Sequence, residues 1–281
     1  DGEKKLAVTS NPSIKMCLTE GSVKVNGWDR NEVRVFVRSG TKFQFRVLER
    51  DKMTARPSWI WLAREDRTSG TECLTGEEIE LDIPKGSSLT VEGRSADLMV
   101  DSIAKVDVKI VEGNAMLRNI HNGVKAVTYQ GDLLVENSSG SISLDSTNGN
   151  IAATAVEPTQ AGDMFRAKTS GGAVALRDAA HRLIDVNSIS GSVRFDGKFS
   201  PGGVYTFKTS NGSILITSPE DLSARVSASF GFGSFQTVLP INITQKTDSP
   251  GSKTVVGTFG KGDADLTLMT LNGTIAIAKR E

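Results

Sequence analysis

Hydrophobic and polar residues alternate in short segments that recur along most of the chain. Within residues 205–216, two pairs of apolar residues flank the turn sequence Ser-Asn-Gly, namely Tyr205 with Phe207 and Ile214 with Ile216. Alternation with a period of two is typical of a β-strand with one buried face. Asn and Gly tolerate the positive φ of a tight turn. The segment therefore predicts a strand, a tight corner and a second strand.

The same template occurs at residues 14–25, 133–144, 165–176, 184–195 and 266–277, and more loosely at residues 226–235. The second strands of four successive copies begin at Val174, Val193, Ile214 and Phe235, which are 19, 21 and 21 residues apart. A repeat near 20 residues with two short strands is typical of one coil of a β-solenoid. Because one coil cannot bury its apolar face alone, we expect neighbouring coils to stack about 4.8 Å apart.

The first 84 residues depart from this rhythm and predict an N-terminal β module. Residues 1–12 are polar and predict a loose start, whereas residues 32–38, 43–47 and 80–83 alternate like strands. We expect residues 1–84 to cap the first coil, because an open coil would offer its edge to other chains. Residues 85–281 are then the β-solenoid repeat domain, with apolar positions recurring about every 9 residues at its start.

Longer corners interrupt the later coils at residues 177–183, 196–203 and 217–223, and the same corner lengthens at residues 240–261. Their spacing by one coil predicts that they gather on one side of the solenoid. Insertions on one side often form the binding face of a repeat protein, although tolerated surface loops are an equal alternative. Residues 178–183 are long enough for a single helical turn.

Three features follow one another in a distinctive order: Gly-Trp-Asp at residues 27–29, Leu-Asp-Ile-Pro-Lys-Gly at residues 81–86, and repeated Thr/Ser-x-x-Gly corners through residue 273. Together, over residues 14–279, they resemble the bacterial DUF4097 family, which is labelled as adhesins and also called toastrack-like. The resemblance implies an all-β, right-handed parallel β-helix or β-solenoid with about 18–21 residues per coil. It also implies an extracytoplasmic or cell-envelope setting, and it brings no catalytic motif.

The charge of the chain is balanced, with 33 basic and 33 acidic residues among 281. The charges are interspersed, so we expect no general attraction to nucleic acid or to an anionic membrane. No apolar run approaches the roughly 20 residues of a membrane-spanning helix. The sequence begins with Asp1, and we expect that a targeting segment has been removed from a protein of the periplasm or cell surface.

Two cysteines, Cys17 and Cys73, are candidates for a disulfide. A bridge between them would close a loop of 57 residues and stabilise the fold by about 4 kcal/mol on the chain-entropy model. Two inert buried thiols are the alternative. A location outside the cytoplasm favours the bridge.

The sequence carries no motif for metal binding or catalysis. His121 and His181 lack cysteine or histidine partners at zinc-ligand spacing, and neither a nucleophile elbow nor a phosphate-binding loop is present. We therefore expect no metal, no cofactor and no catalytic residue. Stacked carboxylates are the alternative, because other β-solenoids cleave polysaccharides with carboxylate pairs; the candidates are Asp97, Asp101, Asp107, Asp132, Asp145 and Asp196.

Trp59 and Trp61 are two residues apart and so project from the same face of a presumed strand. Exposed tryptophan stacks well on sugar rings, which makes the pair a candidate ligand contact; packing inside the N-terminal module is the alternative. We expect a non-catalytic cell-envelope or surface protein, an adhesin or interaction scaffold whose partner is a protein or glycan of the envelope. A polysaccharide-active enzyme and an envelope-stress sensing module are the alternatives.

Overall fold

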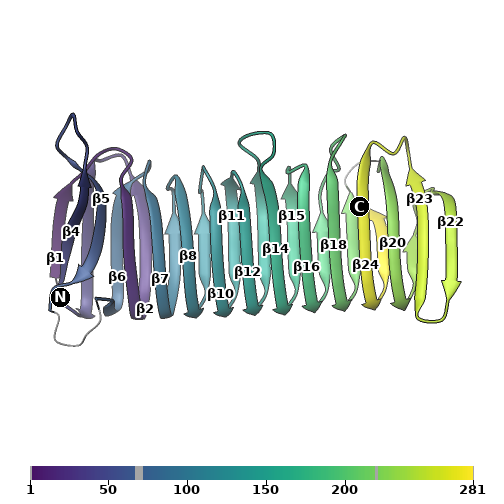
Figure 1. Ribbon diagram of the computed structural model, residues 1–281, viewed down its shortest axis with the longest axis horizontal. Helices are drawn as coiled ribbons and strands as arrows, with labels where there is room; N and C mark the ends of the chain where they lie inside the picture. Colours follow the sequence, from purple (N-terminus) through teal and green to yellow (C-terminus); the bar gives the residue numbers. More distant parts are fainter. Residues whose placement is uncertain (1, 67–71, 219–220, 281) are drawn as a thin grey trace. The chain divides into compact units, whose positions relative to one another are not determined.

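The computed structural model describes residues 2–66, 72–218 and 221–280. Every regular element among these residues is a β-strand, and the strands are numbered β1 to β25 along the chain (Figure 1). The helical turn expected at residues 178–183 is wrong, because β15 extends through Ala179 and β16 already begins at Leu183. Contacts divide the chain into two compact units, Asp1–Ser139 and Gly140–Glu281. The proposed division into residues 1–84 and 85–281 stays a prediction.

Strands of the first unit form two rows of hydrogen-bonded neighbours, β4-β5-β2-β7-β8-β10 and β1-β3-β6-β2-β7-β9-β11. The long strands β2 and β7 contribute one half to each row. The pairs β1–β3, β3–β6 and β4–β5 are antiparallel. All the other neighbouring pairs in these two rows are parallel. The strands are β1 (Gly2–Ala7), β2 (Ser13–Trp28), β3 (Glu32–Gly40), β4 (Phe43–Arg50), β5 (Pro57–Arg64), β6 (Leu74–Pro84), β7 (Ser88–Asp101), β8 (Lys105–Glu112), β9 (Ala115–Arg118), β10 (Val124–Gln130) and β11 (Leu133–Ser139).

The expected loose start of the chain is wrong. Residues Gly2–Ala7 form β1, which pairs antiparallel with Glu32–Val37 of β3. All but one of the six β1 residues are exposed, because an edge strand gains backbone hydrogen bonds on one side while its side chains remain in water. A strand of this kind shows no apolar alternation in the sequence.

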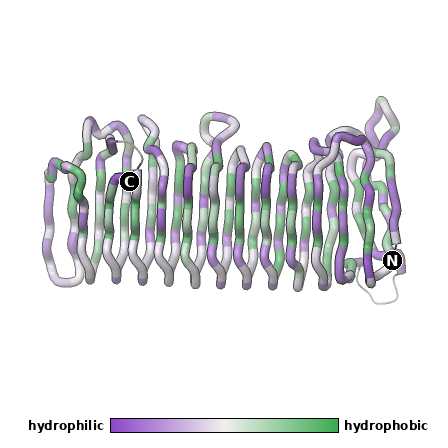
Figure 2. Tube along the Cα trace, turned by 180° about the vertical axis from the view of Figure 1, so that it is seen from behind, coloured by the Kyte–Doolittle hydropathy of each residue, from purple (hydrophilic) through white to green (hydrophobic). Residues whose placement is uncertain are grey.

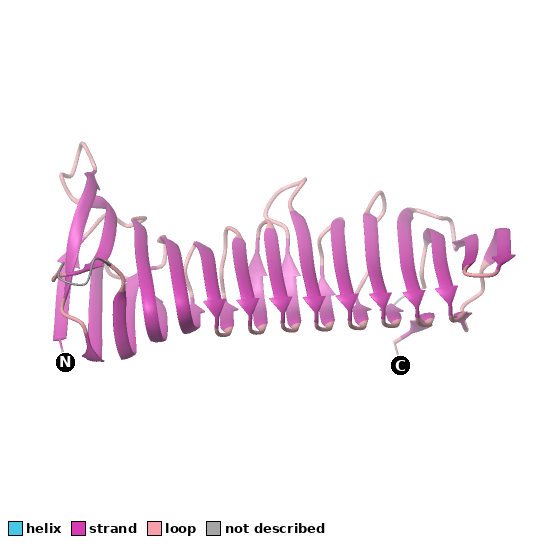
Figure 3. Ribbon diagram, turned by 60° about the horizontal axis from the view of Figure 1, so that its bottom comes forward, coloured by secondary structure: helices cyan, strands magenta, loops and turns pink. Residues whose placement is uncertain are grey.

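The second unit also consists of two rows, β12-β14-β16-β18-β24-β20-β23-β22 and β13-β15-β17-β19-β25-β21 (Figure 3). Neighbouring strands in both rows are parallel, except that β23 is antiparallel to β20 and to β22. The strands are β12 (Ile142–Asn148), β13 (Ile151–Glu157), β14 (Met164–Gly171), β15 (Val174–Ala179), β16 (Leu183–Ser190), β17 (Val193–Asp196), β18 (Val204–Asn211), β19 (Ile214–Ser218), β20 (Ala224–Phe232), β21 (Phe235–Thr237), β22 (Asn242–Ser249), β23 (Ser252–Phe259), β24 (Ala264–Asn272) and β25 (Ile275–Lys279).

The order of the last coils differs from the order of the sequence. Tyr205 pairs with Leu266, and Leu266 pairs in turn with Val226, so β24 lies between β18 and β20. The 21-residue spacing that suggested direct stacking of the coil at Val226 on the coil at Tyr205 is therefore misleading. Residues 240–261 are also not a long loop, because β22 and β23 form an antiparallel hairpin whose second strand pairs with β20.

Side chains that point between the two rows form the core of the second unit. Val193, Ile214 and Ile275 occupy one register line and are at most 1% exposed, whereas Arg194 points into solvent and Leu215 is half-buried. The inward phase predicted from the alternation agrees with this burial. Figure 2 shows the same alternation of hydrophobic and hydrophilic positions along the strands.

Contacts between neighbouring coils explain the Thr-x-x-Gly corners. The Thr209 hydroxyl donates a hydrogen bond of 2.8 Å to the Gly191 carbonyl, and the Thr270 hydroxyl does the same to Gly212. A Cβ added to Gly212 would lie 2.2 Å from the Gly191 carbonyl oxygen. At these corners the template therefore supplies a hydroxyl donor and, where the chains approach most closely, a residue without a side chain.

Candidate functional site

The two candidate tryptophans project from the outer face of β5. Ile60 and Leu62, which alternate with them, are at most 1% exposed and belong to the core. Trp59 is 44% exposed, whereas Trp61 is half-buried. Because β5 is hydrogen-bonded to β4 on one side and to β2 on the other, this face has a rigid backbone.

Two cations hold the ring of Trp61. Lys15 of β2 and Arg46 of β4 are its cross-strand neighbours. The Lys15 ammonium lies 5.9 Å and the Arg46 guanidinium 5.3 Å from a Trp61 ring centroid, within the range of cation–π attraction. Lys15 also pairs with Glu92 at 3.6 Å, and Arg46 forms an ion pair with Glu72. Trp61 is therefore fixed in place, and the charges around it are balanced.

Trp59 keeps a ring surface open to solvent. Its cross-strand neighbours are Ser13 on β2 and Glu49 on β4, and both are exposed. The indole can stack on the C–H face of a sugar ring, while the serine hydroxyl and the carboxylate accept hydrogen bonds from sugar hydroxyls. We name Trp59, Ser13 and Glu49, with Trp61 beside them, the tryptophan face.

Cys17 and Cys73 are joined by a disulfide, with Cα atoms 4.6 Å apart. Cys17 follows Lys15 by two residues on β2, so both side chains lie on the outer face of that strand. Cys73 is adjacent in sequence to Glu72, which pairs with Arg46. The bridge thus anchors the acidic partner of a cation that holds Trp61.

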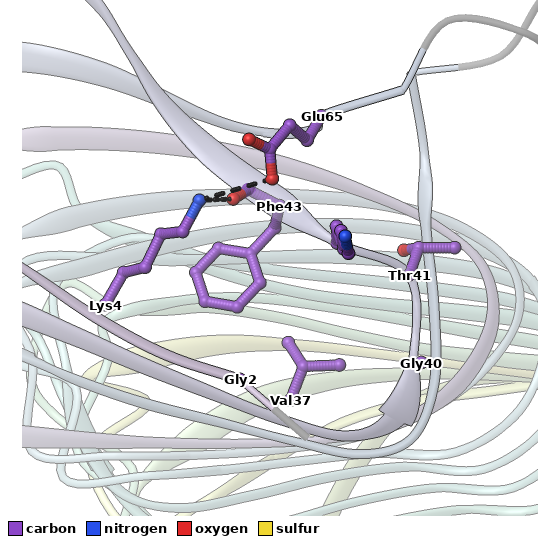
Figure 4. Close-up of a pocket in the computed structure, with 8 residues that line it drawn as sticks. Gly2, Lys4, Val37, Gly40, Thr41, Phe43 and Glu65 are labelled. Carbon is purple, nitrogen blue, oxygen red and sulfur yellow. Dashed lines mark hydrogen bonds and ion pairs between the residues drawn. The ribbon is translucent and has the colours of Figure 1, made fainter.

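A hollow of about 450 Å³ lies in the N-terminal part of the first unit (Figure 4). Its lining includes Lys4 of β1, Phe43 of β4 and Glu65. The Lys4 ammonium donates a hydrogen bond to the Phe43 carbonyl and lies 3.4 Å from the Glu65 carboxylate. Sequence reasoning missed this hollow because its residues come from separate segments without a common motif. The Lys4 ammonium is already bound by two oxygens, and we assign the hollow no ligand.

Four of the carboxylates considered for polysaccharide cleavage each bind a different partner. Asp97 accepts hydrogen bonds from the backbone and side chain of Asn114, and Asp101 accepts one from Asn119. Asp107 lies 3.7 Å from Lys125, and Asp196 binds Arg280. In the part of the chain that the structure describes, no group of three or more His, Cys, Asp and Glu side chains is arranged to hold a metal ion.

The most perturbed carboxylate belongs to the inserted loop after β13. Asp163 is 6% exposed and accepts hydrogen bonds from the Thr159 hydroxyl and amide, the Gln160 amide and the Ser141 hydroxyl. The Thr159 hydroxyl contributes most to holding the pKa of Asp163 far below its usual range, although burial opposes the shift. A carboxylate bound by several donors stays ionised and is a poor proton donor or acceptor for catalysis.

His181 is fully buried in the second unit, and its Nε2 lies 2.8 Å from the Gly140 carbonyl oxygen. Burial lowers the pKa of His181, while the carbonyl and the charges of Asp163 and Glu157 act in the opposite direction. This histidine joins the segment between β15 and β16 to the corner at Gly140, and it is not exposed to solvent. The sequence signals neither role, because Asp163 and His181 meet their partners only through folding and belong to no motif.

The fold is thus that of an all-β repeat protein in which most of the paired strands are parallel. The chain belongs to the family described as Toastrack DUF4097, whose model matches residues 77–278. Among solved structures, one described as a "putative cell adhesion protein" from Clostridium sporogenes ATCC 15579 is similar over 99% of each chain, with 9% sequence identity and a TM-score of 0.30. That likeness is too distant to support an argument here. The comparison with curated proteins gave no match.

Among the described residues, no helix is long and apolar enough to cross a membrane.

Proposed function

We propose that this protein is a non-catalytic protein of the cell envelope or cell surface, an adhesin or interaction scaffold that binds carbohydrate through the tryptophan face. The proposal includes a right-handed β-solenoid as the support for that face. The observation that carries it is the 44% exposure of Trp59 on a strand paired on both sides. Tryptophan is enriched at interfaces because it combines a large apolar ring with a polar N–H group, and this supports a recognition role for Trp59.

The neighbours of Trp59 favour a neutral sugar over an anionic one. The two cations beside Trp61 already form ion pairs, Lys15 with Glu92 and Arg46 with Glu72. Neither of them therefore needs an anionic group of the ligand for charge balance. Glu49 and Ser13 instead offer acceptors for sugar hydroxyls. A rigid ring also loses little conformational entropy on binding.

An extracytoplasmic location is part of the same proposal. The disulfide between Cys17 and Cys73 supports it, because disulfides persist in oxidising compartments and are rare in the cytosol. The envelope is also where a carbohydrate-binding scaffold meets polysaccharide.

The test is binding of the purified protein to a panel of neutral and anionic envelope polysaccharides, followed by tryptophan fluorescence and calorimetry. We expect saturable binding, weakened at least about tenfold by Trp59→Ala, which corresponds to about 1.4 kcal/mol. Tyr129→Ala is the matched control, because Tyr129 is 58% exposed elsewhere in the same unit. Absence of binding, or equal loss in both variants, contradicts the carbohydrate site. Release of new reducing ends in the same wells contradicts the non-catalytic role.

A further inference from the structure

The outermost strand of the second unit has a free edge. All eight residues of β22 are exposed. Among the described strands β22 pairs only with β23, which pairs in turn with β20 (Figure 1). The first row therefore extends two strands beyond β20, whereas the second row ends at the three-residue strand β21. An edge of this length is a template for pairing with another strand.

A hollow of about 310 Å³ lies against the inner side of this extension. Its floor is apolar and includes Phe230, Phe235 and Val255, and its lining also includes Lys246 and Asp248 of β22. Phe230 pairs with Lys253, Lys253 pairs with Asp248, and Val255 pairs with Lys246. Directly paired residues point to the same side of a sheet, so Lys246 and Asp248 share the inner face with the buried Phe230.

We propose that β22 is a homodimerisation edge that pairs antiparallel with β22 of a second copy of this chain, around a twofold axis at Thr247. In this register Lys246 of each copy lies directly opposite Asp248 of the other. Opposite charges in that position stabilise a strand pair, and like charges destabilise it. The edge is therefore complementary to itself.

Charge selects this register from its neighbours. A shift of the axis by one residue, to Lys246 or to Asp248, places two lysines or two aspartates opposite each other. Registers centred between two residues would pair an inner-face residue of one copy with an outer-face residue of the other. The two copies would then expose their hollows on opposite sides of the joined sheet, because side chains alternate along a strand. The axis at Thr247 keeps both hollows on one side and forms two Lys–Asp pairs.

Inward-pointing charges also serve to protect an edge from pairing, and the test must separate the two roles. Asp248 lies 3.4 Å from Lys253 yet keeps 67% of its side chain exposed, so it retains room for a second cation. A charge that only protects the edge disfavours pairing with any other strand. The Lys246 and Asp248 pair disfavours most partner strands but favours a second β22, because that strand runs in the opposite direction and presents its aspartate to the lysine.

The first experiment is sedimentation velocity of the full chain over a wide concentration series. We expect a reversible monomer–dimer equilibrium. Lys246→Asp should shift it to monomer, because four acidic side chains, two from each copy, would then meet across the axis. The double variant Lys246→Asp/Asp248→Lys should restore the dimer, because the pairs are only reversed. Lys261→Asp is the control for charge alone, since Lys261 is exposed outside β22.

A cysteine trap tests the register directly. Opposite Cα atoms in an antiparallel pair are about 4.5–5.5 Å apart, so Thr247→Cys should form a covalent dimer on oxidation. Ser229→Cys on β20 should not. A wild-type chain that stays monomeric throughout, a double variant that fails to recover the dimer, or Thr247→Cys that does not cross-link overturns the proposal. None of these outcomes depends on carbohydrate binding.

Discussion

Tyr205 of β18 pairs with Leu266 of β24, although 61 positions of sequence separate them. The same leucine pairs on its other side with Val226 of β20. The last coil of the chain is thus inserted between two earlier coils. Its apolar face is covered on both flanks, and Leu266 is 1% exposed. The stability of the second unit should therefore depend on contacts that form only when distant segments meet.

Ile214 is the position at which this dependence is best measured. It is fully buried and pairs with Val193 and Ile275 from separate coils. Ile214→Asp should lower the free energy of unfolding by more than the roughly 2–5 kcal/mol of a packing loss, because an unpaired carboxylate is also buried. Urea denaturation followed by circular dichroism measures the change. Leu215→Asp is the matched control on the outer face and should change stability little; equal effects would contradict the assigned phase.

Gly212 should not tolerate a side chain. An alanine Cβ there would lie 2.2 Å from the Gly191 carbonyl oxygen, closer than van der Waals contact allows. We expect Gly212→Ala to cost about 1–3 kcal/mol, the usual range for overpacking, and to lower the melting temperature. At Gly171 the nearest atom is a flexible side-chain oxygen of Asn148 at 3.0 Å. Gly171→Ala should therefore be milder, and a reversed order would contradict the close approach of the corners.

Removal of the disulfide should destabilise the first unit. The bridge joins residues 56 positions apart, and the chain-entropy model gives about 4 kcal/mol for a loop of this length. Reductant should lower the urea midpoint of the wild-type protein toward that of Cys17→Ala/Cys73→Ala. The double variant itself should not respond to reductant. If the wild-type midpoint were equally insensitive, under conditions in which thiol titration shows reduction, the bridge would contribute no stability.

Stability should fall in mildly acidic solution because of His181. Burial lowers its pKa in the folded protein below the ordinary value of 6.5. Above pH 6.5 the imidazole is neutral in both the folded and the unfolded chain, so His181 then causes no loss of unfolding free energy. As the pH falls below 6.5, the unfolded chain binds a proton first, so the free energy of unfolding decreases. Urea titrations at a series of pH values measure this slope.

His181→Gln supplies the control for this pH dependence. The glutamine amide can still donate to the Gly140 carbonyl that faces Nε2 in the wild type, but it does not titrate. We expect the variant to be less stable at neutral pH and to lose less stability between neutral and mildly acidic pH. The same slope in both proteins would assign the pH dependence to other groups.

The sequence alone determined which side is buried in the strands that carry the apolar template. Alternation around Ile214 and Val193 predicts their inward position, because a period of two leaves one face of a strand apolar. The corner residues Thr209 and Gly212 were equally visible, since a hydroxyl residue followed by glycine recurs at several turns. The all-β class and the family resemblance follow from the same short-range pattern.

Only the tertiary structure decided which coils are neighbours. The coils share the same apolar template, so the coil at Val226 fits against either Tyr205 or Leu266. In the structure it pairs with Leu266, and the apolar face of β24 is buried between β18 and β20. The edge strands β1 and β22 escaped detection because their exposed side chains leave no apolar pattern.

The two tryptophans illustrate the same division. Trp59 and Trp61 have the same residue type and the same phase on β5, and the sequence cannot distinguish their roles. Lys15 and Arg46 arrive from other strands and cover Trp61, whereas Ser13 and Glu49 are too small or too solvated to cover Trp59. Exposure depends on neighbours brought together by folding, and alternation along a single strand contains no information about them.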